Sequence, residues 1–236
     1  MQKNPIEHIV VLSGAGISAE SGLTTFRDSG GLWEGFDINE VASIDGWYRN
    51  KEKILDFYNI RRKQAAEVDP NPAHKALADL EKEFQVTIVT QNVDDLHERG
   101  GSSNVIHLHG MLREARSEDD PNVIVDIGDK AISMGDKAPD GTQLRPNVVW
   151  FGEPVPMISK AAEVVSSADL FIVVGTSLAV YPAAGLTDYT KPDIERYLVD
   201  PGIPELYSFD GWVHIKESAA SGVPKLTEKL LNRDYE

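Results

Sequence analysis

The 236-residue chain contains no cysteine, and aromatic residues make up only 8% of it. Without cysteine the chain cannot form disulfides, use a thiolate nucleophile or hold zinc through thiolates. No apolar run approaches the roughly 18 residues that a membrane-spanning helix needs. The first ten residues, MQKNPIEHIV, show no apolar stretch behind a basic flank. We therefore expect no membrane association and a cytoplasmic location.

Basic residues are also scarce: 23 Lys and Arg stand against 38 Asp and Glu, and the formal net charge is −15. Direct nucleic-acid binding needs clustered Lys and Arg, so we expect no nucleic-acid partner. The acidic balance favours Lys-rich protein segments as partners through long-range attraction, although an ordinary acidic enzyme would show the same balance. With 41% hydrophobic residues, the chain can bury a sizeable core.

Short apolar, β-branched runs recur along the chain and are separated by segments with helical spacing. The runs that we expect to form buried strands are residues 9–12, 86–90, 105–110, 147–152, 170–175 and 197–200. Helical patterns cover residues 74–84 and 157–168. Alternating strands and helices imply right-handed crossovers and a parallel sheet covered on both faces. The predicted fold class is α/β, with a Rossmann-like doubly wound sheet.

Two segments interrupt this alternation. Residues 28–68 hold a Gly-rich loop and a helical segment, and residues 113–146 are polar and acidic with little periodicity. We expect both to be insertions that pack together as a small domain. The remaining residues, 1–27, 69–112 and 147–236, then form the large Rossmann-like domain.

A glycine-rich turn follows the first expected strand, in VVLSGAGISAESGLTTFRDSGGLW. Gly14, Gly16 and Ala19 fit the G-x-G-x-x-G/A pattern of a dinucleotide site, in which the glycines allow a tight turn and close approach to a pyrophosphate. A dehydrogenase would continue with a helix and a second strand that ends in an acidic residue. Here a loop with Phe26 and Arg27 follows, and we expect it to close over the reactive end of a nucleotide.

Five blocks of sequence together resemble the sirtuins, the NAD-dependent protein-lysine deacylases. They are GAGISAESGLTTFRD, TQNVDDLHERGG, IHLHG, VVWFGE and GTSLAVYPAAG, and they follow the order of the family over nearly the whole chain. The resemblance implies that NAD is the cofactor and that the substrate is an acylated lysine in a protein. It also implies that the reaction releases nicotinamide and forms free lysine and O-acyl-ADP-ribose.

The resemblance assigns catalytic roles to His109, Asn92 and Asp94. His109 would accept a proton from a ribose hydroxyl, a role that suits an imidazole whose pKa is near neutrality; we interpret the neighbouring His107 as structural. Asn92 and Asp94 can donate to and accept from the carboxamide of nicotinamide; the alternative is a self-capping Asn/Asp turn. The implied cofactor-binding residues, besides Asn92 and Asp94, are Gly14, Ala15, Gly16, Ala19, Phe26, Arg27, Gln91, Val93, Gly175, Thr176, Ser177, Asp200 and Ala219.

Tyr58 and Arg61 are three residues apart and share a helix face. They resemble the Tyr-x-x-Arg of class III sirtuins, which remove succinyl, malonyl and glutaryl groups. An acyl carboxylate calls for a buried cation with a planar fork and a hydroxyl donor. The alternative is that Arg61 and Arg62 are solvated charges on a helix. The resemblance also places substrate along Val148, Val149, Phe151 and Gly152, for which an ordinary core strand is the alternative.

The chain departs from the family pattern in its second insertion. Most sirtuins bind structural zinc there through four cysteines, whereas this segment has neither Cys nor His. We expect it to fold without zinc, stabilised by packing of Val123, Ile124, Val125, Ile127 and Ile132. Asp200 stands where the family usually has Asn, and Thr24 stands where many members have Pro, a change that we expect to alter loop stiffness only.

The leading function is therefore an NAD-dependent protein deacylase that prefers acidic acyl groups and retains deacetylase activity. Three alternatives stay open: an ordinary deacetylase, a mono-ADP-ribosyltransferase or NAD hydrolase, and a non-catalytic NAD sensor. We expect a monomer, because no long unpaired apolar stripe is evident in the sequence.

Overall fold

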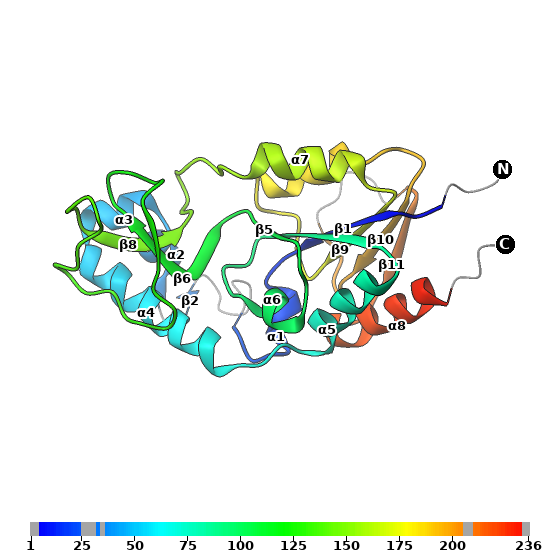
Figure 1. Cartoon of the computed structure of the whole chain (residues 1–236), viewed down its shortest axis with the longest axis horizontal. Helices are drawn as coiled ribbons and strands as arrows, with labels where there is room; N and C mark the ends of the chain where they lie inside the picture. Colours follow the sequence, from blue (N-terminus) through cyan, green and yellow to red (C-terminus); the bar gives the residue numbers. More distant parts are fainter. Residues whose placement is uncertain (1–4, 25–31, 34–35, 205–209, 233–236) are drawn as a thin grey trace.

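The computed structural model of the chain describes residues 5–24, 32–33, 36–204 and 210–232. A six-stranded parallel sheet with helices on both faces forms the larger part, and a lobe of helices and short strands lies at one end (Figure 1). In sheet order the strands are β11 (Trp212–Ile215), β10 (Glu195–Val199), β9 (Leu170–Val174), β1 (His8–Ser13), β4 (Gln85–Thr90) and β5 (Val105–His107). The predicted Rossmann-like parallel sheet is confirmed.

Strand β1 lies at the topological switch point of this sheet. The chain runs from β1 to β4 and β5 on one side, and then returns to β9, which pairs with β1 on the other side. Ligands of open α/β sheets bind outside the carboxyl ends of the strands at such a point. The turns that follow β1, β4 and β9 therefore meet where a ligand is expected.

The side chains of β1 alternate between two apolar cores, one on each face of the sheet. Ile9 and Val11 belong to the core under α5 (Pro72–Asp79) and α8 (Ala219–Leu231). Val10 and Leu12 belong to the core under α7 (Ile158–Ser167) and the 3-10 helix η2 (Ala183–Tyr189). Figure 1 shows α7 on one face and α5 with α8 on the other. Burial of both faces explains why these strands read as continuous apolar runs.

The small lobe has its own core. Its elements are β2 (Leu32–Trp33), β3 (Phe36–Asp37), α2 (Ile38–Val41), α3 (Ile44–Arg49), α4 (Lys51–Glu67), β6 (Gly110–Ser117), β7 (Ile124–Asp126) and β8 (Leu144–Val148). Strands β7, β6 and β8 form an antiparallel sheet, and α4 packs on β6 and β8. Trp47, Phe57 and Trp150 are buried between them. The division into two domains stays a prediction; β6 and β8 run across its boundaries at 112 and 146.

Short elements complete the fold. They are α1 (Gly16–Ala19), the 3-10 helix η1 (Leu80–Lys82) and α6 (Leu96–Gly100). None of the helices in the described part of the chain has both the length and the apolar character to cross a membrane.

Several predicted boundaries are wrong where the chain passes between the two parts. The expected strand 105–110 is divided, because β5 ends at His107 and β6 begins at Gly110, whose φ of 78° turns the chain into the small lobe. The expected strand 147–152 starts earlier and ends at Val148. Strand β11 was not predicted. The helical segment expected within residues 28–68 is divided at Asn50 into α3 and α4, and the Asn50 side chain accepts a hydrogen bond from the first turn of α4.

The expected apolar packing in place of zinc is present in part. Ile132 is buried, Ile127 packs on the small-lobe core, and Val123 and Val125 are half-buried, but Ile124 is 49% exposed. Polar contacts also hold the segment: the Gln143 amide donates to the Ser133 carbonyl at 3.0 Å and to that of Leu144 at 2.9 Å. Within the described ranges, no group of three His, Cys, Asp or Glu side chains is arranged to hold a metal ion.

Candidate active site

A cavity of about 520 Å³ lies between the carboxyl edge of the large sheet and the small lobe. The predicted site residues that line it are Gly14, Ala15, Gly16, Ala19, Tyr58, Arg61, Gln91, Asn92, Val93, Asp94, His109, Val148, Val149, Phe151, Gly152, Gly175, Thr176, Ser177, Asp200 and Ala219. Two further predicted residues, Phe26 and Arg27, lie outside the described residues. Segments far apart in the sequence are thus brought to one cavity, but their roles stay predictions.

The glycine turn after β1 is held against the end of β9. Gly14 N–H donates to the Val174 carbonyl at 3.0 Å. Gly16 N–H donates to the Gly175 carbonyl at 2.8 Å. Gly175 has a φ of 61°, and a Cβ added there would lie 2.3 Å from Ile17 N. Close packing of the two turns therefore requires glycine here, in addition to any approach of a nucleotide.

The loop after β4 carries Asn92 and Asp94, which are joined through Ser18. Asn92 Nδ2 donates to Ser18 Oγ at 3.1 Å, and Ser18 Oγ donates to Asp94 Oδ2 at 3.1 Å. Leu96 N–H donates to Asp94 Oδ1 at 3.2 Å, so the self-capping turn that was the alternative interpretation is also present. Burial raises the pKa of Asp94, although the Leu96 and Ser18 hydrogen bonds act in the opposite direction. Both side chains remain part of the cavity wall.

His109 lies two residues beyond β5 with its ring in a fixed orientation. Its Nδ1 is 3.0 Å from the Gln91 carbonyl oxygen. A carbonyl can only accept, so the neutral ring carries its proton on Nδ1 and leaves a lone pair on Nε2. Burial lowers the pKa of His109 below its usual value, and the hydrogen bond to Gln91 opposes this only in part. The ring is therefore neutral at neutral pH and can accept a proton.

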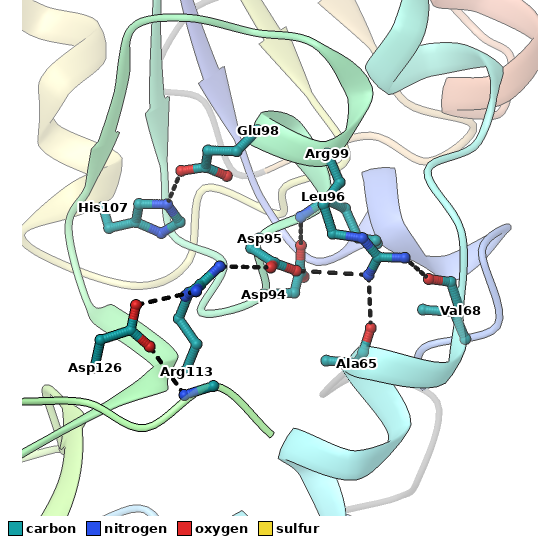
Figure 2. A network of polar contacts seen from close by, with 11 residues as sticks. Ala65, Val68, Asp94, Asp95, Leu96, Glu98, Arg99, His107, Arg113 and Asp126 are labelled. Carbon is teal, nitrogen blue, oxygen red and sulfur yellow. Dashed lines mark hydrogen bonds and ion pairs between the residues drawn. The ribbon is translucent and has the colours of Figure 1, made fainter. Parts of the chain in front are cut away.

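A polar network around Asp95, Arg99 and Arg113 supports the Asp94 loop (Figure 2), and these three residues do not line the cavity. Arg99 on α6 donates to the carbonyls of Ala65 at 3.0 Å and Val68 at 2.5 Å, at the carboxyl end of α4. Arg99 and Arg113 each form an ion pair with Asp95 at 3.6 Å. The last carbonyls of a helix have no intrahelical partners. Arg99 supplies hydrogen-bond donors to those at the end of α4 and so attaches α4 to α6.

His107 is part of the same network and does not line the cavity. Its Nε2 is 2.7 Å from Glu98 Oε1, and its Nδ1 is 3.0 Å from the Asn92 carbonyl oxygen. Burial lowers the pKa of His107, but the Glu98 hydrogen bond and charge outweigh burial and raise it overall. The pKa of His107 is thus raised, whereas that of His109 is lowered.

Tyr58 and Arg61 reach the cavity from α4. Their exposed fractions are 2% and 6%, so the alternative of a solvated arginine is wrong. Arg61 Nη1 donates to Thr24 Oγ1 at 3.2 Å and to Gln64 Oε1 at 3.3 Å. Thr24 therefore does more than alter loop stiffness. The Tyr58 hydroxyl accepts a hydrogen bond from Trp150 Nε1 at 2.9 Å, and burial raises the pKa of this phenol, which stays protonated.

Arg62, the next residue on α4, is also buried but does not line this cavity. Its Nε donates to the Leu112 carbonyl at 2.5 Å and its Nη1 to Asn59 Oδ1 at 2.8 Å. Burial lowers the pKa of Arg62 to about 10. The two neighbouring arginines are thus directed to different places, and only Arg61 faces the cavity.

The segment after β8 forms another wall. Val148 is buried in the small-lobe core, so the core-strand alternative holds for it in part. Val149 N–H donates to the His109 carbonyl at 2.9 Å, which ties this segment to the catalytic candidate. Phe151 is 49% exposed and Gly152 has a φ of 92°, so neither belongs to a buried strand.

The opposite end of the cavity lies under β9 and β10. Gln91 Nε2 donates to Thr176 Oγ1 at 3.0 Å, which connects the β4 and β9 ends. Asp200 follows β10, is buried, and accepts from Gly202 N–H at 2.8 Å through Oδ1. Ala219 is the first residue of α8. These residues lie outside the carboxyl ends of the strands, where ligands of open α/β sheets bind.

Among the cavity-lining residues that sequence reasoning missed are Ser18, Trp150 and Glu153. Each lines the cavity and belongs to a block that the sequence analysis quoted. Position within these blocks was a usable signal for their presence in the site. It carried no information about their partners, because Trp150 meets Tyr58 across 92 residues of sequence.

Comparisons with known proteins identify the family to which the chain belongs. A sequence model of the Sir2 family matches residues 14–182, and the chain therefore belongs to the Sir2 family. An NAD-dependent protein deacylase of Helicobacter pylori (strain ATCC 700392 / 26695) is 54% identical over 226 residues, covering 96% of this chain and 98% of the relative. An NAD-dependent protein deacylase of Bacteroides thetaiotaomicron is 48% identical over 96% of this chain and 99% of its own.

Solved structures of Sir2 proteins are similar over the whole fold. A Sir2 homologue whose crystal structure was solved in complex with NAD is 36% identical in sequence to this chain. The two structures superpose with a TM-score of 0.86, and the match covers 96% of this chain and 90% of the homologue.

Proposed function

We propose that this member of the Sir2 family is an NAD-dependent protein-lysine deacylase that prefers acyl groups ending in a carboxylate, such as succinyl and malonyl, and that deacetylates as a second activity. The observation that carries the acyl preference is the burial of Tyr58 and Arg61 in the wall of the cavity that also contains His109. The relatives named NAD-dependent protein deacylase support the reaction class.

The residues of the cavity fit NAD. The packed glycine turns leave backbone rather than side chains at the switch point, and Gly175 tolerates no Cβ. We assign the pyrophosphate to Gly14, Ala15, Gly16 and Ala19. The adenosine half is assigned to Gly175, Thr176, Ser177, Asp200 and Ala219, and the nicotinamide end to Gln91, Asn92, Val93 and Asp94. Phe26 and Arg27 are proposed to cover the reactive end. When bound, NAD supplies the ADP-ribosyl group that accepts the acyl group as nicotinamide leaves.

His109 is proposed to act as the general base. Its Nε2 carries the free lone pair because Nδ1–H is committed to the Gln91 carbonyl. A base of this kind contributes about 10²- to 10⁴-fold to a rate. Asn92 and Asp94 are proposed to orient the carboxamide that leaves, with Ser18 holding the two side chains in register.

The acylated lysine is proposed to enter beside Val148 and Val149, with its peptide along Phe151 and Gly152. A peptide that adds as a strand is bound mainly through main-chain hydrogen bonds, which leaves the acyl pocket to decide specificity. Arg61 offers a planar fork to the acyl carboxylate and Tyr58 a hydroxyl donor. Hydrogen bonds to charged groups contribute about 1.5–3 kcal/mol, or about 10- to 150-fold in discrimination against acetyl.

A protein substrate has a precedent among Sir2 structures. A Sir2 mutant solved with a p53 peptide and NAD is 29% identical, with a TM-score of 0.76 and coverage of 95% of this chain and 94% of its own. We further propose that the chain acts as a cytoplasmic monomer. We also propose that it makes no direct contact with nucleic acid, and the formal net charge of −15 supports this second point.

The test compares kcat/KM for acetyl- and succinyl-lysine peptides of one sequence, with wild type, Arg61→Met and Arg62→Met. We expect wild type to prefer succinyl, Arg61→Met to remove that preference, and Arg62→Met to keep it, because Arg62 is a buried arginine of the same helix outside the cavity. If acetyl is preferred by wild type, the chain is an ordinary deacetylase. Consumption of NAD without deacylation of either peptide would favour the transferase or hydrolase alternative.

A further inference from the structure

Trp150 makes a hydrogen bond that bears directly on the acyl pocket. The indole is 2% exposed, and its Nε1–H donates to the Tyr58 hydroxyl oxygen at 2.9 Å. An indole N–H can only donate, so in this pair the tyrosine oxygen is the acceptor. The ring centroids of the two residues are 6.0 Å apart. Contact and hydrogen bond together fix the indole against the phenol.

This bond decides what the Tyr58 hydroxyl can still do. A phenolic oxygen has one proton to donate, and the Trp150 N–H occupies an acceptor position on it. No residue in the described ranges accepts a hydrogen bond from the Tyr58 hydroxyl, and the ring lines the cavity. The proton is therefore available to a ligand, and donation to the oxygen by Trp150 makes the hydroxyl a better donor.

Trp150 is itself held by a buried ion pair. The Arg145 guanidinium carbon lies 3.5 Å from the centre of the Trp150 ring. Arg145 pairs with Glu153 at 2.8 and 2.9 Å, and Glu153 Oε2 accepts a hydrogen bond from the backbone N–H of Trp150 at 2.9 Å. Trp47 packs on the same indole with ring centroids 5.4 Å apart. If the indole turned away from Tyr58, it would therefore lose its stacking on Arg145 and its contact with Trp47.

We propose that Trp150 is a positioning residue for acyl selectivity: its indole N–H orients the Tyr58 hydroxyl so that the phenolic proton is directed to the carboxylate of the acyl group. The inference rests on the proposed function, because it presupposes that Tyr58 and Arg61 bind an acyl carboxylate. An acetyl group has no carboxylate to receive this proton. Loss of the indole N–H should therefore weaken succinyl recognition more than acetyl recognition.

The experiment replaces Trp150 by phenylalanine, which keeps an aromatic ring and removes the N–H. For Trp150→Phe we expect the ratio of kcat/KM for succinyl- over acetyl-lysine peptide to fall about three- to tenfold, the range for one hydrogen bond. The change should lie mainly in KM for the succinyl peptide. Calorimetric binding of the same peptides to the protein without NAD should show a matching loss of succinyl affinity.

Two comparisons separate positioning from packing. Trp47→Phe also removes a buried indole from the cluster, but it keeps an aromatic ring against Trp150 and leaves the Trp150 indole N–H in place, so we expect it to keep the ratio. In a Tyr58→Phe background, Trp150→Phe should cause no further change in the ratio. Substitution of Trp150 by benzothienylalanine, which has the indole shape without the N–H, repeats the test if phenylalanine leaves the protein unfolded.

The outcomes are distinct. Equal losses for both acyl groups, or a change of ratio that persists in the Tyr58→Phe background, would overturn the role of Trp150 while leaving the proposed function intact. A wild-type enzyme without preference for the succinyl peptide would refute the proposed acyl preference itself, and the role of Trp150 with it.

Discussion

At the scale of single residues, His109 combines an oriented lone pair with a pKa below its usual value. The Gln91 carbonyl fixes the Nδ1–H tautomer, and burial favours the neutral ring. Protonation as the pH falls would remove the base, so the acid limb of kcat/KM should lie below the usual histidine pKa of about 6.5. We expect His109→Ala to lower kcat by about 10²- to 10⁴-fold.

The measurement is kcat/KM from pH 5 to 8 with a succinyl-lysine peptide. An acid limb above pH 6.5 would point instead to His107, whose pKa is raised overall because Glu98 outweighs burial. The two histidines are shifted in opposite directions, so the position of the limb discriminates between them.

Thr24 provides a second prediction at this scale. Its hydroxyl accepts a hydrogen bond from Arg61 Nη1 at 3.2 Å. Thr24→Val keeps the shape and removes the acceptor, so we expect the succinyl preference to fall about three- to tenfold as Arg61 loses one contact that orients it. Thr24→Ser keeps a hydroxyl and should retain most of the preference. Steady-state kinetics with both peptides provides the check, and an unchanged ratio in Thr24→Val would contradict it.

The individual site residues were predictable to different degrees. Tyr58, Arg61 and His109 were proposed from short motifs, because each motif fixes residue types at fixed spacing. The Thr24–Arg61 and Trp150–Tyr58 contacts were not predictable, because they join residues 37 and 92 positions apart. Pairings of that kind depend on how helix and loop pack, which spacing along the chain does not encode.

At the scale of elements, a buried ion-pair cluster holds β6, β8 and the loop after β8 together. Glu153 Oε1 pairs with Arg145 at 2.8 Å and with Arg116 at 2.9 Å. Burial disfavours the Glu153 carboxylate, but the arginine hydrogen bonds and charges outweigh it and lower its pKa. Loss of the Glu153 charge would leave the Arg116 and Arg145 guanidinium groups without the carboxylate that they share. We therefore expect Glu153→Gln to lower the free energy of unfolding by about 3 kcal/mol.

Urea denaturation of wild type and Glu153→Gln tests this estimate. Addition of EDTA serves as the second arm, because a lobe that folds without zinc should keep its melting temperature. A large drop in melting temperature with EDTA would show that a metal stabilises the lobe. A Glu153→Gln protein as stable as wild type would show that the ion pair does not stabilise it.

The same elements show where sequence patterns stop being informative. Strands β1, β4 and β9 were predicted closely because burial on both faces makes them continuous apolar runs. The small-lobe strands were predicted poorly. Ile124 on β7 is exposed, and Arg116 and Arg145 on β6 and β8 are largely buried, so hydrophobicity does not follow burial there.

At the scale of the whole molecule, two buried histidines connect pH to stability. His74 on α5 and His97 on α6 have ring centroids 5.0 Å apart, and both are almost fully buried. His97 Nε2 is 2.8 Å from Ser13 Oγ on β1, so the pair joins two helices to the central strand. Burial lowers the pKa of His74 to about 4 and that of His97 well below its usual value.

Both histidines are therefore neutral in the folded protein and become protonated in the unfolded chain below pH 6.5. The unfolded state then binds more protons, and stability falls as the pH falls. For His74 the loss grows at about 1.4 kcal/mol per pH unit between pH 6.5 and 4, to about 3 kcal/mol in total. The raised pKa of Asp94 acts in the opposite direction, because its folded form retains a proton at higher pH.

The difference in slope between wild type and His74→Asn isolates the contribution of one histidine. A plot of the free energy of unfolding against pH from 7 to 4.5 should be shallower for the variant, by up to about 1.4 kcal/mol per unit. A constant offset between the two curves would reflect packing alone, because loss of contacts changes stability equally at every pH. Parallel curves would mean that His74 is protonated in the folded protein as readily as in the unfolded chain. The neutral His74–His97 pair would then not be the cause of the loss of stability at low pH.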